Sequence, residues 1–178
     1  EQYLHQENVE GLLFKYKHFY GSYDFFASSR RWYRNEIRIV KFDPAVHSYR
    51  DAQGFRKNDR KIRVKPIDAY IYHYGWVKAP KGLVNKMRNF NQFYHNEQWI
   101  QEHIPAELAF DYGNADILEK FEESHPEVMQ KRINAINWKF DFDPTELKSK
   151  TDFRRRILQK IESWTGWRIG ENKNYIEV

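Results

Sequence analysis

Apolar and polar side chains alternate along several segments in the first half of the chain, and this period of two predicts β-strands. From Val9 to Tyr20, the two sides of the alternation are Leu12, Phe14, Tyr16, His18 and Tyr20 against Leu13, Lys15, Lys17 and Phe19. The same pattern predicts strands over Glu36–Phe42 and around Ile62–Val64. Two intervening segments, 21–29 and 48–59, are rich in turn-forming residues and are expected to be loops.

The segment that follows Pro66 has the clearest alternation in the chain. One face carries Ile67, Ala69, Ile71 and His73, and the other carries Asp68, Tyr70, Tyr72 and Tyr74. The pattern stops at Gly75-Trp76, which predicts a strand that presents His73 at the rim of a sheet. A histidine on an apolar face can equally be a core residue that binds a backbone carbonyl.

The second half of the chain has a helical period instead. Ala79-Pro80 is a typical helix start, and the helix is expected to run to Asn96 with one apolar stripe, formed by Leu83, Met87, Phe90 and Tyr94. Further helices are expected over 114–123, 126–137 and 151–164. We therefore divide the chain into a sheet-bearing part, residues 1–96, and a helical extension, residues 97–178.

Composition limits the class of protein. A chain of 178 residues with 17% aromatic residues can bury a core of ordinary size, and 30 Lys and Arg against 25 Asp and Glu suit an anionic partner. The chain has no cysteine, which excludes disulfides and fits a reducing compartment. No apolar run reaches the roughly 18 residues that a membrane span needs.

Three separated blocks carry a family resemblance. In order they are residues 30–39 (RRWYRNEIRI), residues 48–56 (SYRDAQGFR) and residues 72–76 (YHYGW). Together they resemble the C-terminal half of bacterial family 2 glycosyltransferases, above all the subgroup of lipopolysaccharide-core sugar transferases. The resemblance covers roughly residues 9 to 95.

The resemblance implies an α/β fold, namely the acceptor-side half of a GT-A type glycosyltransferase with a helical C-terminal extension. The implied reaction moves a sugar from a nucleotide-diphosphate donor to a glycan or lipid-linked acceptor in surface polysaccharide synthesis, in the cytoplasm. The nucleotide-binding half and its Asp-containing metal motif are missing from this sequence, which begins at Glu1 without Met. We therefore expect a fragment that is inactive alone.

The resemblance also assigns roles to single residues. His73 matches a late histidine that can complete the site of a divalent cation, Mg²⁺ or Mn²⁺, and the diphosphate. Asp51 stands in about the position of the catalytic base, although an aspartate there can equally cap the turn that follows it. Glu36 and Asp68 are weaker candidates for the base.

Basic and aromatic residues flank these blocks. The arginines are candidates for binding phosphate, or alternatively form a solvated basic rim: Arg30, Arg31, Arg34 and Arg56. Trp76 is the aromatic residue that we expect to stack on a sugar ring. The sequence lacks H-x-H and H-x-x-x-H pairs and a glycine-rich phosphate loop, so a zinc enzyme or an NTPase is not expected.

Two other functions remain open. The basic, aromatic-rich composition would suit a nucleic-acid-binding or carbohydrate-binding module without catalysis, but acids are interspersed throughout and no known nucleic-acid motif occurs, so no nucleic acid is expected. In residues 151–167 the apolar stripe Phe153, Ile157, Ile161 and Trp164 is flanked by Arg154, Arg155, Arg156 and Lys160. This helix either packs on the preceding helices or associates with an anionic membrane surface.

Overall fold

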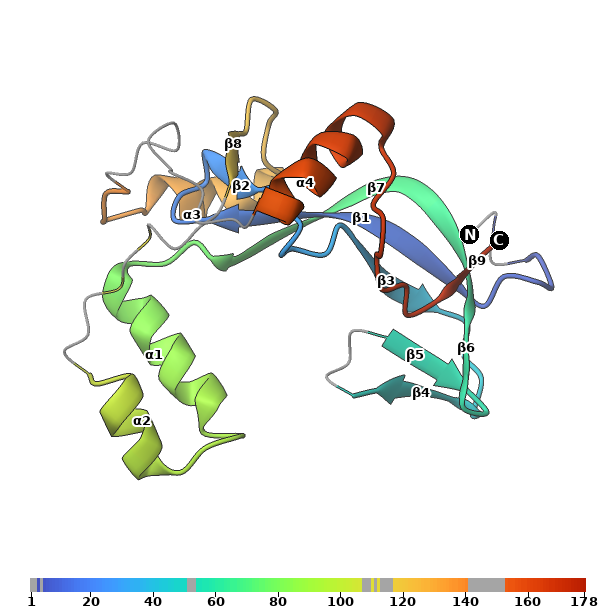
Figure 1. Cartoon of the computed structure of the whole chain (residues 1–178), viewed down its shortest axis with the longest axis horizontal. Coiled ribbons are helices and arrows are strands. Elements are labelled where there is room, and N and C mark those ends of the chain that lie inside the picture. The colour runs from blue at the N-terminus through green and yellow to red at the C-terminus, as the bar shows by residue number, and fades with distance from the viewer. Residues whose placement is uncertain are drawn as a thin grey trace. The chain divides into compact units, whose positions relative to one another are not determined.

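A computed structural model describes residues 3, 5–50, 54–106, 110, 112, 117–140 and 153–178, with the backbone alone at 153–156. The chain is a mixed α/β protein (Figure 1), as the sequence predicts. It divides into two compact units. Unit 1 comprises Glu1–Lys17, Arg30–Tyr72 and Asp152–Val178, and unit 2 comprises His18–Ser29 and His73–Thr151.

Two long strands, β1 (Gly11–Tyr20) and β7 (Arg63–Trp76), are neighbours in the main sheet and contribute residues to both units. The amide of Glu10 donates to the carbonyl of Arg63 (2.8 Å), and that of Gly21 donates to the carbonyl of Trp76 (3.1 Å). As the donor moves from Glu10 to the later residue Gly21, its acceptor moves from Arg63 to the later residue Trp76. The two strands β1 and β7 therefore run in the same direction. Near this end of the two strands, residues that precede Gly21 and Trp76 by the same small number therefore lie at about the same level.

Unit 1 extends this sheet and adds a small second one. β3 (Asn35–Val40) pairs antiparallel with β1, and β9 (Ile176–Glu177) pairs in parallel with the start of β7. The second sheet has the order β4 (Val46–Tyr49), β5 (Gly54–Lys57) and β6 (Arg60–Lys61). Helix α4 (Phe153–Thr165) also belongs to this unit. The core of unit 1 is a cluster of buried aliphatic side chains, namely Leu13, Ile37, Ile62 and Val64.

Unit 2 combines short strands with helices. The end of β1 pairs with β2 (Phe25–Ala27), which pairs with β8 (Leu118–Lys120). The helices are α1 (Pro80–Asn91), α2 (Glu97–His103) and α3 (Gln130–Asn134), which Figure 1 labels, and the 3₁₀ turn η2 (Glu127–Met129) directly precedes α3. Within the described residues, no helix has the length and apolar character that crossing a bilayer requires.

The core of unit 2 is aromatic. The ring of Phe19 lies within 5.0 Å, between centroids, of the rings of Tyr74, Phe121 and His125. His125 lies between the hydroxyl of Tyr74 at Nδ1 (2.8 Å) and the carbonyl of Tyr23 at Nε2 (3.0 Å). Burial lowers the pKa of His125. A neutral imidazole with a partner on each nitrogen serves the core, so His125 is a structural histidine.

The alternating segments are strands as predicted, and residues 63–64 and 67–76 join into one, since β7 passes through Pro66. Three predictions were wrong. The segment 21–29 contains β2, the segment 48–59 contains β5 and the end of β4, and β8 lies where a helix over 114–123 was expected. The helix that begins at Pro80 ends at Asn91, and Asn96 instead caps α2 by accepting from the amide of Trp99 (2.9 Å).

Candidate functional site

His73 lies beside a second histidine, His18, near the ends of β7 and β1. Their Nδ1 atoms are 3.2 Å apart, and the rings meet edge to face with centroids separated by 5.2 Å. The parallel register explains this neighbourhood, because His18 precedes Gly21 by three residues and His73 precedes Trp76 by three. His18 is 2% exposed and His73 is half-buried, so the pair forms a partly covered polar group in unit 2.

The absence of a side chain at Gly75 leaves room for the imidazole ring of His73. A Cβ at position 75 would lie 2.5 Å from Nε2 and 2.8 Å from Cε1 of His73. Any side chain there would have to displace the imidazole. The glycine in the sequence His73-Tyr74-Gly75-Trp76 is therefore required for this close approach of ring and backbone.

Lys86, on helix α1, completes the group. Its Nζ donates to the carbonyl of Gly75 (3.0 Å) and lies 4.1 Å from the ring centroid of Trp76. Nζ would also lie 3.2 Å from a Cβ at Gly75, so ammonium and imidazole are both next to the same glycine. We call His18, His73, Gly75, Trp76 and Lys86 the His–Lys group.

The electrostatics of Lys86 favour an anionic ligand. Burial, and secondarily the charge of Lys78, lower the pKa of Lys86. The surroundings of the Lys86 ammonium therefore offset only part of the cost of keeping it charged. An anion bound beside Nζ would supply the missing negative charge, as phosphate oxygens do in many lysine sites. Trp76 adds an aromatic face, which lies near Tyr20 with a centroid separation of 6.2 Å.

Metal binding through His73 stays a prediction. Within the described part of the chain, no group of three or more His, Asp or Glu side chains is arranged to hold an ion. Because Nδ1 of His73 faces His18, a cation would bind through Nε2. These residues therefore fit a cation only as one ligand among others.

The arginines predicted to bind phosphate have protein partners in unit 1. Arg30 pairs with Glu162 (2.6 Å) and donates to the carbonyl of Ile169. Arg34 pairs with Glu171 (3.1 Å). These ion pairs attach the segment before β3 to the C-terminal part of the chain.

The remaining predicted site residues lie elsewhere in unit 1 or outside the described part. Arg56 is 8% exposed and donates to the side-chain oxygen (3.1 Å) and the carbonyl (3.2 Å) of Asn174. Arg31 is exposed. Asp51, the predicted base, lies outside the described residues. The structure thus brings together His73 and Trp76 in unit 2, whereas the four arginines belong to unit 1.

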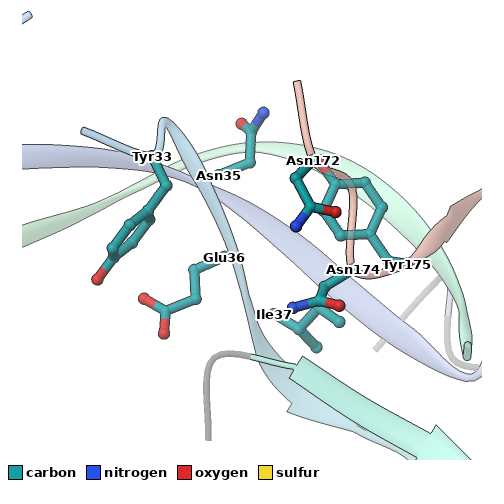
Figure 2. Close-up of a pocket in the computed structure, with 7 residues that line it drawn as sticks. All are labelled: Tyr33, Asn35, Glu36, Ile37, Asn172, Asn174 and Tyr175. Atoms are coloured by element: carbon teal, nitrogen blue, oxygen red, sulfur yellow. The ribbon is translucent and has the colours of Figure 1, made fainter. Parts of the chain in front are cut away.

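Glu36, one of the two weaker candidates for the base, lies in a second polar site. Its carboxylate is 6% exposed and accepts from Arg38 (2.7 Å), which also donates to the hydroxyl of Tyr16 (2.7 Å). Burial raises the pKa of Glu36 against the opposing effect of Arg38. A cavity of about 60 Å³ adjoins this carboxylate. Figure 2 shows that its walls come from β3, from Tyr33 just before that strand, and from the C-terminal segment that carries Asn172, Asn174 and Tyr175.

Sequence signals for the missed residues differ in strength. His18 stands in the same alternating face as Tyr16 and Tyr20, so its burial in β1 could be foreseen. Lys86 follows Gly75 by eleven residues in a helix, and no pattern marks it. Asn172 and Asn174 of the Glu36 pocket belong to an irregular segment without periodicity.

Comparisons with protein-family models, with curated proteins and with solved structures found no match to this chain.

Proposed function

We propose that this chain is the acceptor-side part of a GT-A type glycosyltransferase of family 2. The whole enzyme would move a sugar from a nucleotide-diphosphate donor to a glycan or lipid-linked acceptor in surface polysaccharide synthesis. The proposal rests on the three residue blocks described above and on one structural observation. That observation is the placement of the His73 ring and the Lys86 ammonium beside Gly75, where both lie close to the position that a Cβ would take.

The His–Lys group has the chemistry that a departing diphosphate requires. Breaking the bond to the sugar leaves negative charge on the diphosphate oxygens, and fixed cations beside them lower the barrier. Lys86 would supply a full charge from a partly desolvated position, where an ion pair is stronger than in water. His73 would donate or accept at Nε2, and Trp76 would pack against the donor or acceptor ring.

A divalent cation, Mg²⁺ or Mn²⁺, would neutralise further charge on the diphosphate when bound. Of the described residues, His73 is the one that we propose as its ligand. Asp51 remains the proposed base that takes the proton of the acceptor hydroxyl.

The test is a ³¹P NMR titration of uridine and guanosine diphosphate with the 178-residue chain, with and without Mg²⁺. We expect weak binding, since the resemblance places most of the nucleotide site upstream. Lys86→Met should weaken it about tenfold, the cost of one charge-assisted contact. Lys81→Met, an exposed lysine on the same helix, is the matched control and should leave binding unchanged.

Other outcomes would reject the proposal. Equal binding to the Lys86→Met and Lys81→Met proteins would place the diphosphate away from the His–Lys group. Tight retention of single-stranded oligonucleotides, with no preference for diphosphates, would favour the nucleic-acid alternative. His73→Ala should abolish any gain in affinity that Mg²⁺ gives, and a gain that survives would remove His73 as the cation ligand.

We also propose that helix α4 associates with the cytoplasmic face of the inner membrane, where a lipid-linked acceptor would lie. Trp164 is 91% exposed and Trp167 is 65% exposed. Ile157, which lies on the same helical face as Trp164, is also exposed. Tryptophan rings favour the water–lipid boundary, and basic residues attract anionic head groups. The exposure of Trp164 supports this interpretation over packing of the whole stripe within the protein.

A further inference from the structure

The Glu36 pocket has walls that are polar and well fixed. Besides Ile37, it is lined by three amides, two phenols and a carboxylate, namely Asn35, Asn172, Asn174, Tyr33, Tyr175 and Glu36 (Figure 2). All of them belong to unit 1. Primary amides and phenols both donate and accept hydrogen bonds, so the lining can match a ligand group that does both.

Two interactions set the amide of Asn174. Arg56 donates to its Oδ1 (3.1 Å), which fixes Nδ2 as the donor end. Gly54 lies against the same side chain, since a Cβ at position 54 would be 3.2 Å from Cβ, Cγ and Nδ2 of Asn174. The ring of Tyr175 packs against the buried core of unit 1. The amide of Asn174 and the ring of Tyr175 are therefore held in place before any ligand arrives.

The charge of the pocket disfavours ions. In its ionised form Glu36 would repel an anion, and it is then paired with Arg38 at 2.7 Å, which removes the need for a second cation. Burial raises the pKa of Glu36, as it does the pKa values of Tyr33 and Tyr175. Each shift favours the neutral form of the group. The pocket is thus built for neutral hydrogen-bonding groups.

The size of the pocket limits what enters. About 60 Å³ has room for a few water molecules, which is enough for one or two hydroxyl groups or a hydroxymethyl arm and too little for a sugar ring. Tyr33, which lines the pocket and is 36% exposed, offers an aromatic surface for the remainder of such a ligand.

We infer that this pocket binds the hydroxyl-bearing edge of a neutral sugar in the acceptor glycan. Hydroxyl groups donate and accept as water does, and they would replace water against the amides of Asn172 and Asn174 and the carboxylate of Glu36. The inference deepens the proposed function and rests on it, since the acceptor side of a sugar transferase must hold a glycan. It concerns residues that are separate from the His–Lys group.

Saturation-transfer difference NMR of the 178-residue chain tests the inference. The probes are the methyl glycosides of glucose, galactose and mannose, N-acetylglucosamine, and glucuronate as the anionic comparison. At least one neutral sugar should receive saturation, and glucuronate should bind more weakly. Asn172→Ala changes an exposed side chain and should weaken the binding about fivefold, the value of one hydrogen bond.

Two further variants make the test specific. Gly54→Ala should also weaken sugar binding, because the new methyl group displaces the amide of Asn174. Asn89→Ala, an exposed asparagine on α1, is the matched control and should change nothing. Lys86→Met should keep the sugar signal, so a failed diphosphate titration and a failed sugar titration are separate results.

The inference is overturned if no neutral sugar receives saturation, in which case the pocket holds only water. It is also overturned if a sugar binds equally to the Asn172→Ala and Gly54→Ala proteins, because the ligand then lies elsewhere. Preferential binding of glucuronate would contradict the neutral character assigned to the pocket.

Discussion

The Nδ1 atoms of His18 and His73 face each other at 3.2 Å. Two nitrogens at this distance form a hydrogen bond only if one carries a hydrogen and the other offers a lone pair. When both rings are neutral, one must therefore be the Nδ1–H tautomer and the other the Nε2–H tautomer. The ring with a bare Nε2 would be the one suited to a cation or an acid ligand.

Long-range ¹⁵N–¹H NMR in mildly alkaline buffer should detect these opposite tautomers. His18→Phe should remove the pairing and alter the Nδ1 signal of His73. His47→Gln, a change at an exposed histidine, should alter neither ring. Finding both rings in the Nε2–H form would show that this hydrogen bond does not exist in solution.

Glu10 gives unit 1 a defined sensitivity to acid. Its carboxylate accepts from Arg60 (2.8 Å) and from the amide of Arg63 (2.8 Å). The hydrogen bond from Arg60, opposed by burial, lowers the pKa of Glu10 from 4.5 to about 2. A lowered pKa means that the unfolded chain binds the proton more tightly than the folded chain does. The stabilisation from Glu10 is therefore complete above pH 4.5 and is lost as the pH falls toward 2.

Glu10→Gln should therefore lower the free energy of unfolding at neutral pH by about 2 kcal/mol. This value is below the full effect of the pKa shift, because Arg60 is 44% exposed and water screens the pair. Urea unfolding at neutral pH and near pH 3 measures the difference, which should shrink in acid. Glu119→Gln, at an exposed position, is the control; an equal loss at both pH values would assign the effect to packing.

Helix α4 should bind vesicles that contain anionic lipid. Co-sedimentation with phosphatidylglycerol vesicles should weaken with salt, and Trp164→Ala with Trp167→Ala should reduce it about tenfold, because two exposed rings leave the interface. Trp99→Ala, on α2, should have little effect. Binding that is equal on neutral vesicles, or unchanged without the two rings, would leave α4 as a surface helix without a lipid partner.

The sequence predicted the long strands well and the short elements poorly. In β7, Ile67 and Ala69 are half-buried while Asp68 and Tyr70 are exposed, as the alternation requires. β8 has three residues, too few for any period to show, and Leu118 is its one buried side chain. Pairing with β2 makes this segment a strand, and a single sequence does not reveal such a partner.

The candidate sites differ in the same way. His73 stood out because a strand ended there, but its neighbour Lys86 comes from a helix and is placed by tertiary contacts alone. Helical spacing over 83–94 suggested a buried stripe, yet Leu83 is buried while Phe90 is 59% exposed and Tyr94 is 63% exposed. Spacing identifies a face, and only the packed structure tells how far that face is covered.

The bond between Arg56 and Asn174 joins positions 118 residues apart, and β9 joins Arg63 to Ile176. Contacts this remote along the chain form slowly, because a long loop must close before any bonding is gained. During translation β1, β3 and the first part of β7 can pair early, whereas the Glu36 pocket must wait until residue 175 has left the ribosome. An unfinished polypeptide would therefore be unable to hold a sugar in this pocket, and acquisition of sugar binding would mark the last step of folding in unit 1.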